Sequence, residues 1–310
     1  MKVGILLHPE RGIDAVFEEA RLADEQGFDS IWVGDHLMTF RGEHLPSGPM
    51  DSFTLMTALA ARTTRVRIAW AMLNLNFRNP ALLAKMLATV DHISKGRVIC
   101  AVGSGWFEEE HRAYDLPWIA DHDARAAFAR EAIRLMRELW THPAPERVTF
   151  EGEYVRVHEL PFNPAPYQQP HPPIWVGGDS AATLETVKEL GDGWAMTGAP
   201  SAERVASVRS APDWPQRPMT LIAGAVVYVG ETYEEVASDA AYVYERVVAS
   251  GAPPAPTLEE YLAQAIVGTP AQCLERLDEL ESWGVDYIRL NERNPAMQEK
   301  VARLLLPRLA

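Results

Sequence analysis

Gly27-Phe28-Asp29-Ser30-Ile31-Trp32-Val33-Gly34-Asp35-His36 is the stretch of sequence that decides the fold. Gly27 follows an amphipathic helical pattern and suits the left-handed position that ends a helix. Ser30 to Val33 is a short apolar run, which predicts a buried strand. The strand then gives way to Asp35 and His36. A helix, a short buried strand and polar residues at the strand's carboxyl end together predict an α/β protein.

The same unit recurs on both sides of this stretch. Ile13, Val16, Ala20 and Ala23 lie on one helical face before it. Short apolar runs alternating with helical patterns predict parallel strands joined by helices, with an open doubly wound sheet as the competing architecture. We expect a (β/α)8 TIM barrel forming a single domain over residues 1–310. The eight predicted strands span residues 2–7, 30–33, 66–73, 98–102, 174–176, 194–196, 221–229 and 286–290.

One segment departs from this alternation. Residues 148–157 alternate around Glu151-Gly152, which predicts a β-hairpin, and a proline-rich loop follows at 161–173. We interpret residues from about 146 to 173 as an insertion after the fourth βα unit.

Composition excludes several classes of partner. A net charge of −14 over 310 residues argues against nucleic acid, whose binding needs clustered Lys and Arg. No apolar run reaches the roughly 20 residues of a membrane span, and the amino terminus turns polar too early for a signal peptide. We therefore expect a cytoplasmic protein. Cys100 and Cys273 have no metal-type spacing, and the apolar run around Cys100 predicts a buried thiol.

Polar residues and glycines follow the predicted strands, where barrel enzymes place their sites. Asp35 and His36 suit an acid/base pair or a hydrogen-bonding pair beside a cofactor ring, because imidazole titrates near neutral pH. A single histidine after a strand is more often structural. Metal binding by His8, Asp35 and His36 is a weaker alternative, and we expect no metal.

A second group of residues suits an anion. Gly177-Gly178-Asp179-Ser180 precedes a predicted helix, whose amino terminus favours negative charge. Thr197-Gly198, one strand further on, adds a hydroxyl and an amide. These residues predict a phosphate-binding cup. An ordinary turn is an equally good interpretation, because Asp179 would repel a phosphate if it pointed inward.

Taken in order, several segments resemble the bacterial luciferase-like monooxygenase superfamily, and most closely its actinobacterial branch that uses coenzyme F420, a 5-deazaflavin. The resemblance covers residues 1 to about 200 and returns at Gly268-Thr269-Pro270. The segments that carry it are residues 27–36, 78–86, 88–97, 103–110, 172–178 and 191–194.

The resemblance implies a barrel with the cofactor ring at its carboxyl-terminal mouth and a cis peptide, Ala71–Met72, behind the ring. It places His36 beside the reactive ring edge and Asn74 near the ring. It assigns the cofactor phosphate to Gly177, Gly178, Ser180, Thr197 and Gly198. Trp70 and Met72 are bulkier than the family's usual residues, and we expect them to reshape the wall behind the ring.

The leading functional hypothesis is F420-dependent hydride transfer to or from a small organic substrate, with His36 as proton donor or acceptor. The alternatives are an FMN-dependent monooxygenase and a non-catalytic flavin-binding protein. Ala199-Pro200 stand where sugar-phosphate dehydrogenases of the family carry basic residues, which argues against a phosphorylated sugar. We expect a homodimer, with substrate walls at residues 39–49, 146–159 and 249–257.

Overall fold

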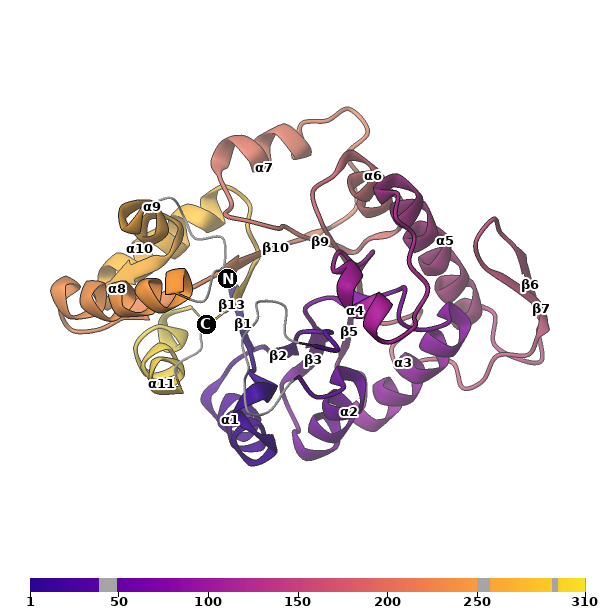
Figure 1. The fold of residues 1–310 in the computed structure, drawn as a ribbon, viewed down its shortest axis with the longest axis horizontal. Helices are drawn as coiled ribbons and strands as arrows, with labels where there is room; N and C mark the ends of the chain where they lie inside the picture. Colours follow the sequence, from indigo (N-terminus) through magenta and orange to yellow (C-terminus); the bar gives the residue numbers. More distant parts are fainter. Residues whose placement is uncertain (39–48, 250–256, 292–294, 310) are drawn as a thin grey trace.

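Eight parallel strands close into a barrel in the computed structural model (Figure 1), which describes residues 1–38, 49–249, 257–291 and 295–309. The ring closes because β3 pairs with β5 and β1 pairs with β13. This closure confirms the predicted (β/α)8 barrel over an open sheet. In order around the ring, the strands are β1 (Lys2–Leu6), β2 (Ser30–Val33), β3 (Arg67–Trp70), β5 (Val98–Gly103), β8 (Ile174–Gly177), β9 (Gly193–Ala195), β10 (Thr220–Ala225) and β13 (Tyr287–Leu290).

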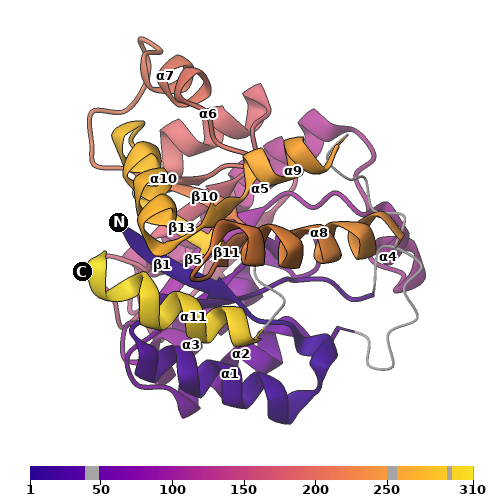
Figure 2. The same ribbon diagram turned by 90° about the vertical axis from the view of Figure 1, so that its left-hand side faces the viewer.

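Helices surround the barrel in chain order (Figure 1), and α8 to α11 cover the face seen in Figure 2. Side-chain capping starts several of them: Asp51 accepts a hydrogen bond from Thr54 N, and Thr269 with Gln272 forms a capping box. The helices are α1 (Ile13–Gln26), α2 (Ser52–Arg62), α3 (Pro80–Ser94), α4 (Glu108–Ala113), α5 (His122–Thr141), α6 (Ala181–Leu190), α7 (Ala202–Arg209), α8 (Tyr233–Ala249), α9 (Leu258–Gln264), α10 (Pro270–Ser282) and α11 (Pro295–Leu304), with short 3-10 turns at Pro9–Arg11 and Leu306–Arg308.

Aromatic side chains fill the interior of the barrel. Trp32 of β2 stacks on Trp175 of β8 with ring centroids 5.7 Å apart, and Tyr287 of β13 meets Trp175 edge-on at 5.1 Å. Gly4 of β1 makes this packing possible, because a Cβ there would lie 2.5 Å from Trp32 Nε1. The barrel therefore has a solid aromatic floor, and any ligand must bind above it, toward the carboxyl ends of the strands.

The third strand differs from its prediction. It ends at Trp70, the Ala71–Met72 peptide is cis as the resemblance implied, and pairing with β5 resumes in β4 (Leu73–Asn74). Trp70 is fully buried on the outer side of the barrel and stacks on Phe53 of α2 at 5.1 Å. The expectation that Trp70 reshapes a ligand-facing wall is therefore wrong, whereas Met72 does point toward the interior cluster.

Two features lie outside the barrel. The predicted hairpin is present as β6 (Val148–Glu151) paired antiparallel with β7 (Arg156–Leu160), beyond α5 in Figure 1. The predicted seventh strand is split: β10 belongs to the barrel, and β11 (Val227–Val229) turns away to pair with β12 (Ile266–Gly268), which sequence did not predict.

Burial of both cysteines agrees with the sequence: Cys100 and Cys273 are fully enclosed, and burial raises the pKa of each thiol, that of Cys273 to about 12. Within the described ranges, none of the helices has the length and apolar character to span a bilayer.

The expected substrate walls at 39–49 and 249–257 lie almost entirely outside the described residues.

Candidate functional site at the barrel mouth

All residues predicted for the site lie at or just beyond the carboxyl ends of five strands, β2, β3, β4, β8 and β9. Asp35 and His36 follow β2, and the cis Ala71–Met72 peptide follows β3. The remaining residues follow the next strands around the ring: Asn74 at the end of β4, Gly177 to Ser180 after β8, and Thr197-Gly198 after β9. Parallel strands deliver their carboxyl ends to one mouth, so the fold brings the predicted set to the same end of the barrel.

Asp35 is the centre of a buried hydrogen-bond network. Its carboxylate forms a two-pronged ion pair with Arg78, with N–O distances of 2.8 and 3.0 Å. It also accepts hydrogen bonds from Ser52 Oγ at 2.5 Å and from Asn74 N at 2.9 Å. Burial opposes the charge of Arg78, but the hydrogen bonds and attraction of Asp35 outweigh burial and raise the pKa of Arg78. The predicted acid/base role of Asp35 stays a prediction, and these four contacts favour a role in holding β2, β4 and α2 together.

His36 has a partner that sequence reasoning missed. Its Nδ1 lies 3.1 Å from Oε1 of Glu110, and Oε2 of Glu110 accepts a hydrogen bond from Leu37 N at 3.0 Å. Glu110 is 1% exposed, although it belongs to a run of three glutamates at the start of α4. A carboxylate at Nδ1 fixes the imidazole's orientation and favours a proton on that nitrogen. The ring is therefore held so that Nε2 is the nitrogen turned away from Glu110.

The His36 ring lies next to the cis peptide. A methyl group on Gly34 would touch both His36 Cδ2, at 3.7 Å, and the carbonyl oxygen of Ala71, at 4.0 Å. Trp106 meets the His36 ring edge-on with centroids 5.7 Å apart, and 61% of its surface is exposed. The histidine and an exposed indole are thus in contact, and the cis peptide and the histidine both lie close to Gly34.

Asn74 holds helix α4 from the other side. Its Nδ2 donates to His111 Nε2 at 3.0 Å, and His111 Nδ1 donates to the carbonyl of Pro117 at 2.7 Å. Because an amide nitrogen only donates, Nε2 of His111 is the acceptor in this contact. Gly105 has a positive φ and lies so close to Asn74 that a Cβ would come within 2.6 Å of Oδ1. The position of Asn74 relative to a cofactor ring stays a prediction.

The predicted phosphate cup is built partly as expected. Ser180 caps α6 by accepting a hydrogen bond from Thr183 N at 3.2 Å. Gly178 has a φ of 129° and donates its N–H to Ala195 O at 3.1 Å, so that amide is already used by the barrel wall. Gly177 must be small, because a Cβ there would lie 2.9 Å from Met72 Cγ.

Asp179 lies in the cup as a built-in anion. Its carboxylate accepts hydrogen bonds from Thr197 N, at 3.0 Å, and from the Thr197 hydroxyl, and it pairs with Arg204 of α7. Arg204 was not predicted; its Nη1 donates to Thr197 O at 2.9 Å. This oxyanion corner, made of Asp179, Thr197 and Arg204, already holds a carboxylate on donors suited to a phosphate. It therefore fits a phosphorylated cofactor, provided that Asp179 moves aside.

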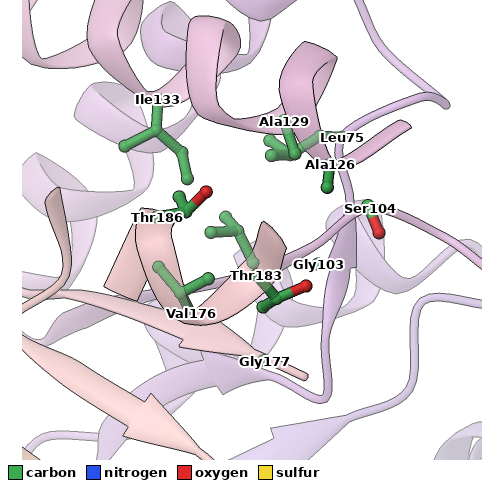
Figure 3. Close-up of a pocket in the computed structure, with 11 residues that line it drawn as sticks. Leu75, Gly103, Ser104, Ala126, Ala129, Ile133, Val176, Gly177, Thr183 and Thr186 are labelled. Atoms are coloured by element: carbon green, nitrogen blue, oxygen red, sulfur yellow. The ribbon is translucent and has the colours of Figure 1, made fainter. Parts of the chain in front are cut away.

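A small cavity lies behind the cup, between α5 and α6 (Figure 3). Ser104 and Thr183 border it, and Ala126, Ala129 and Ile133 of α5 form its apolar wall. Its volume of about 10 Å³ is room for a single water molecule. The cavity is too small for a phosphate, so an anion of that size has to bind in the cup itself.

Comparison with known proteins places these features in a family. The model of the luciferase-like monooxygenase family matches residues 1–287. An FMNH2-dependent dimethylsulfone monooxygenase of Pseudomonas putida is 28% identical over 87% of this chain and 80% of its own length. An F420-dependent glucose-6-phosphate dehydrogenase of Amycolatopsis mediterranei is 35% identical over 64% of this chain, and the match spans 57% of that relative's length. The crystal structure of the monooxygenase RslO1 from Streptomyces bottropensis superimposes with a TM-score of 0.78 and 26% identity, covering all of both chains.

Proposed function

This chain belongs to the luciferase-like monooxygenase family, and we propose that it is an F420-dependent oxidoreductase that transfers a hydride between the deazaflavin and a small organic substrate. The observation that carries the proposal is the His36–Glu110 pair beside the cis Ala71–Met72 peptide. Moving a hydride to or from an organic group requires a proton to move as well, and an imidazole held by a buried carboxylate is suited to that task. The F420-dependent relatives add support, since their identity of 33–35% exceeds that of the monooxygenase relative.

When bound, the cofactor supplies the two-electron chemistry, and the protein supplies position and electrostatics. Thr197, Ser180, Gly198 and Arg204 would hold its phosphate, and Ala71, Met72 and Asn74 would lie by its ring. His36 donates or accepts the substrate proton at Nε2, and Glu110 keeps that nitrogen in place. The Asp35–Arg78 ion pair fixes the loop that carries His36.

An FMN-dependent monooxygenase, in which reduced flavin reacts with oxygen, is the second candidate. One observation favours it: the match to the dimethylsulfone monooxygenase extends over 80% of that relative, against 57% for the first glucose-6-phosphate dehydrogenase. Likeness over nearly the whole chain includes the later strands, which form half of the mouth.

Titration with both cofactors separates the two candidates. We expect F420 to quench tryptophan fluorescence saturably and FMN to bind at least about tenfold more weakly, a difference of about 1.4 kcal/mol. Tighter binding of FMN, together with oxygen uptake when reduced FMN and a substrate are supplied, would establish the monooxygenase instead. His36→Ala should keep cofactor affinity within about twofold and lose substrate turnover by roughly 100-fold or more. Unchanged turnover in that variant would refute the proton-transfer role.

A further inference from the structure

Arg289 lies inside the barrel, above its aromatic floor. It follows Tyr287 by two residues on β13, so both side chains point to the same face of the sheet. Tyr287 belongs to the interior cluster that includes Trp32 and Trp175. The guanidinium carbon of Arg289 lies 5.9 Å from the centroid of the Trp32 ring. Because Arg289 comes later on the strand than Tyr287, it lies nearer the mouth.

The strand beside Arg289 leaves room for the guanidinium. Gly224 of β10 is its register partner, and a Cβ on Gly224 would come within 3.0 Å of Arg289 Nη2. The same Cβ would lie 3.1 Å from Asn291 Nδ2. A glycine at this position is thus the condition for a long cationic side chain to extend across the inner wall.

Among the described residues, Arg289 has no carboxylate partner, in contrast to Arg78 on the other side of the mouth. Within the ranges that the structure describes, Arg289 makes one hydrogen bond, from Nε to Asn291 Oδ1 at 3.1 Å, and no ion pair. A guanidinium has five N–H donors, so most of its donors face no protein acceptor in those ranges. Burial lowers the pKa of Arg289 to about 10, and no acidic group among the described residues opposes that effect. The residue nevertheless keeps partial exposure, so a ligand can reach it from the mouth.

The position of Arg289 around the ring separates it from the residues predicted for the cofactor. Those residues follow β2, β3, β4, β8 and β9. The closed order of the strands places β10, β13 and β1 together as the remaining arc of the wall. His36 follows the next strand beyond β1, so an organic molecule anchored on this arc has the proposed proton donor on its flank.

We propose that Arg289 binds an oxyanion group of the substrate, and that the substrates of this protein are small organic acids such as carboxylates or sulfonates. This inference rests on the proposed function, because it assigns the substrate side of the same mouth. The planar fork of a guanidinium matches the two oxygens of such a group. Trp32 beneath the guanidinium keeps its plane in place.

The test measures binding of matched charged and neutral probes by calorimetry, without cofactor and at constant ionic strength. The pairs are benzoate with benzamide and methanesulfonate with dimethyl sulfone. We expect the wild-type protein to bind each anion at least about tenfold more tightly than its neutral partner. Arg289→Gln should abolish this preference, and Arg289→Lys should retain part of it. Arg21→Gln, which removes an exposed arginine of α1 that pairs with Glu18 and Glu25, should leave it unchanged.

Two results would overturn the proposal. The first is a wild-type protein that shows no preference for the anions, or that binds neither anion at tens of millimolar. The second is a preference that persists in Arg289→Gln. A cofactor arm identifies the competing source of negative charge, the reduced flavin ring. If Arg289→Gln weakens reduced FMN at least about tenfold and leaves the anion probes unaffected, the arginine belongs to the cofactor and the proposal fails. If neither F420 nor FMN binds the wild-type protein, the proposed function fails, while the anion titrations still decide the role of Arg289.

Discussion

Two walls of the barrel mouth treat buried charge in opposite ways. On the paired wall, which consists of Asp35, Arg78, His36, Glu110, Asn74 and His111, each polar group meets another within the protein. On the arginine wall, formed by Arg289, Gly224 and Asn291, a partly buried guanidinium has a single amide oxygen as partner among the described residues.

This difference separates charged groups that stabilise the fold from charged groups that are suited to bind a ligand. Removing the partner of a buried charge is costly, because the remaining charge is then uncompensated. An uncompensated one costs stability in the protein by itself, so its presence needs a reason outside the fold. The paired wall is therefore held in place by its own hydrogen bonds, whereas the unused donors of the arginine wall are suited to a bound ligand.

Removing one half of a buried pair should give the largest effect. Asp35→Asn keeps the shape of the side chain but leaves Arg78 uncompensated, so we expect the free energy of unfolding to fall by about 3–5 kcal/mol, measured by urea denaturation. The double variant Asp35→Asn/Arg78→Met should recover part of the loss. As a control, Glu189→Gln breaks the exposed pair with Arg134 and should cost less than about 1 kcal/mol. A loss in Asp35→Asn as small as that in the control would show that the paired wall does not depend on this ion pair.

The opposite sign is expected on the arginine wall. Arg289→Met removes a desolvated charge and should stabilise the protein by about 1–3 kcal/mol at neutral pH. Burial lowers the pKa of Arg289 to about 10, below its ordinary value. Above pH 10 the folded protein therefore releases this proton before the unfolded chain does, and the cost of the charge declines. The stability gap between variant and wild type should thus shrink from about pH 9 to about pH 11. A destabilised Arg289→Met would mean that the arginine supports the fold.

One strand of the barrel could be predicted to the residue. The strand Ser30–Val33 has the same bounds in the structure as in the sequence analysis, because it is a short apolar pattern with clear polar ends. The seventh strand was overextended, since the apolar run continues past Ala225 while the chain leaves the barrel to pair with β12. Periodicity shows that a run is buried, but it cannot show which strand will be its neighbour.

The candidate site was predicted in part. His36 could be named from its place after a predicted strand, and the cis Ala71–Met72 peptide from the resemblance to the family. Their partners could not, because Glu110 is 74 residues from His36 along the chain and acts only through a contact in space. One signal was nevertheless present: Arg289 alternates with Tyr287 on a strand, which places both side chains on the same face.

Glu110 offers a sharper test of the paired wall, in activity rather than stability. Glu110→Gln keeps an acceptor for Leu37 N but loses the charge that orients His36, so we expect kcat to fall about ten- to a hundredfold. The dissociation constant of the cofactor should stay within about twofold, which a general disruption of the mouth would not allow. Glu108→Gln, on the same helix and paired with exposed Arg112, is the matched control and should retain full activity. Equal losses in both variants would assign the effect to helix α4 as a whole.

The smallest effect is expected at the oxyanion corner. Its cation, Arg204, is paired with the Asp179 carboxylate, which a phosphate must displace. Asp179→Asn weakens the competitor for Thr197 and Arg204, so FMN should bind about three- to tenfold more tightly, corresponding to at most about 1.4 kcal/mol. Riboflavin, which has the same ring and no phosphate, should bind both proteins alike. Fluorescence titrations at two salt concentrations check the cause, since an added phosphate–arginine contact makes affinity for FMN more dependent on salt. Weaker binding of FMN by Asp179→Asn would show that the aspartate organises this corner for the phosphate, and the built-in anion would then be part of the cup.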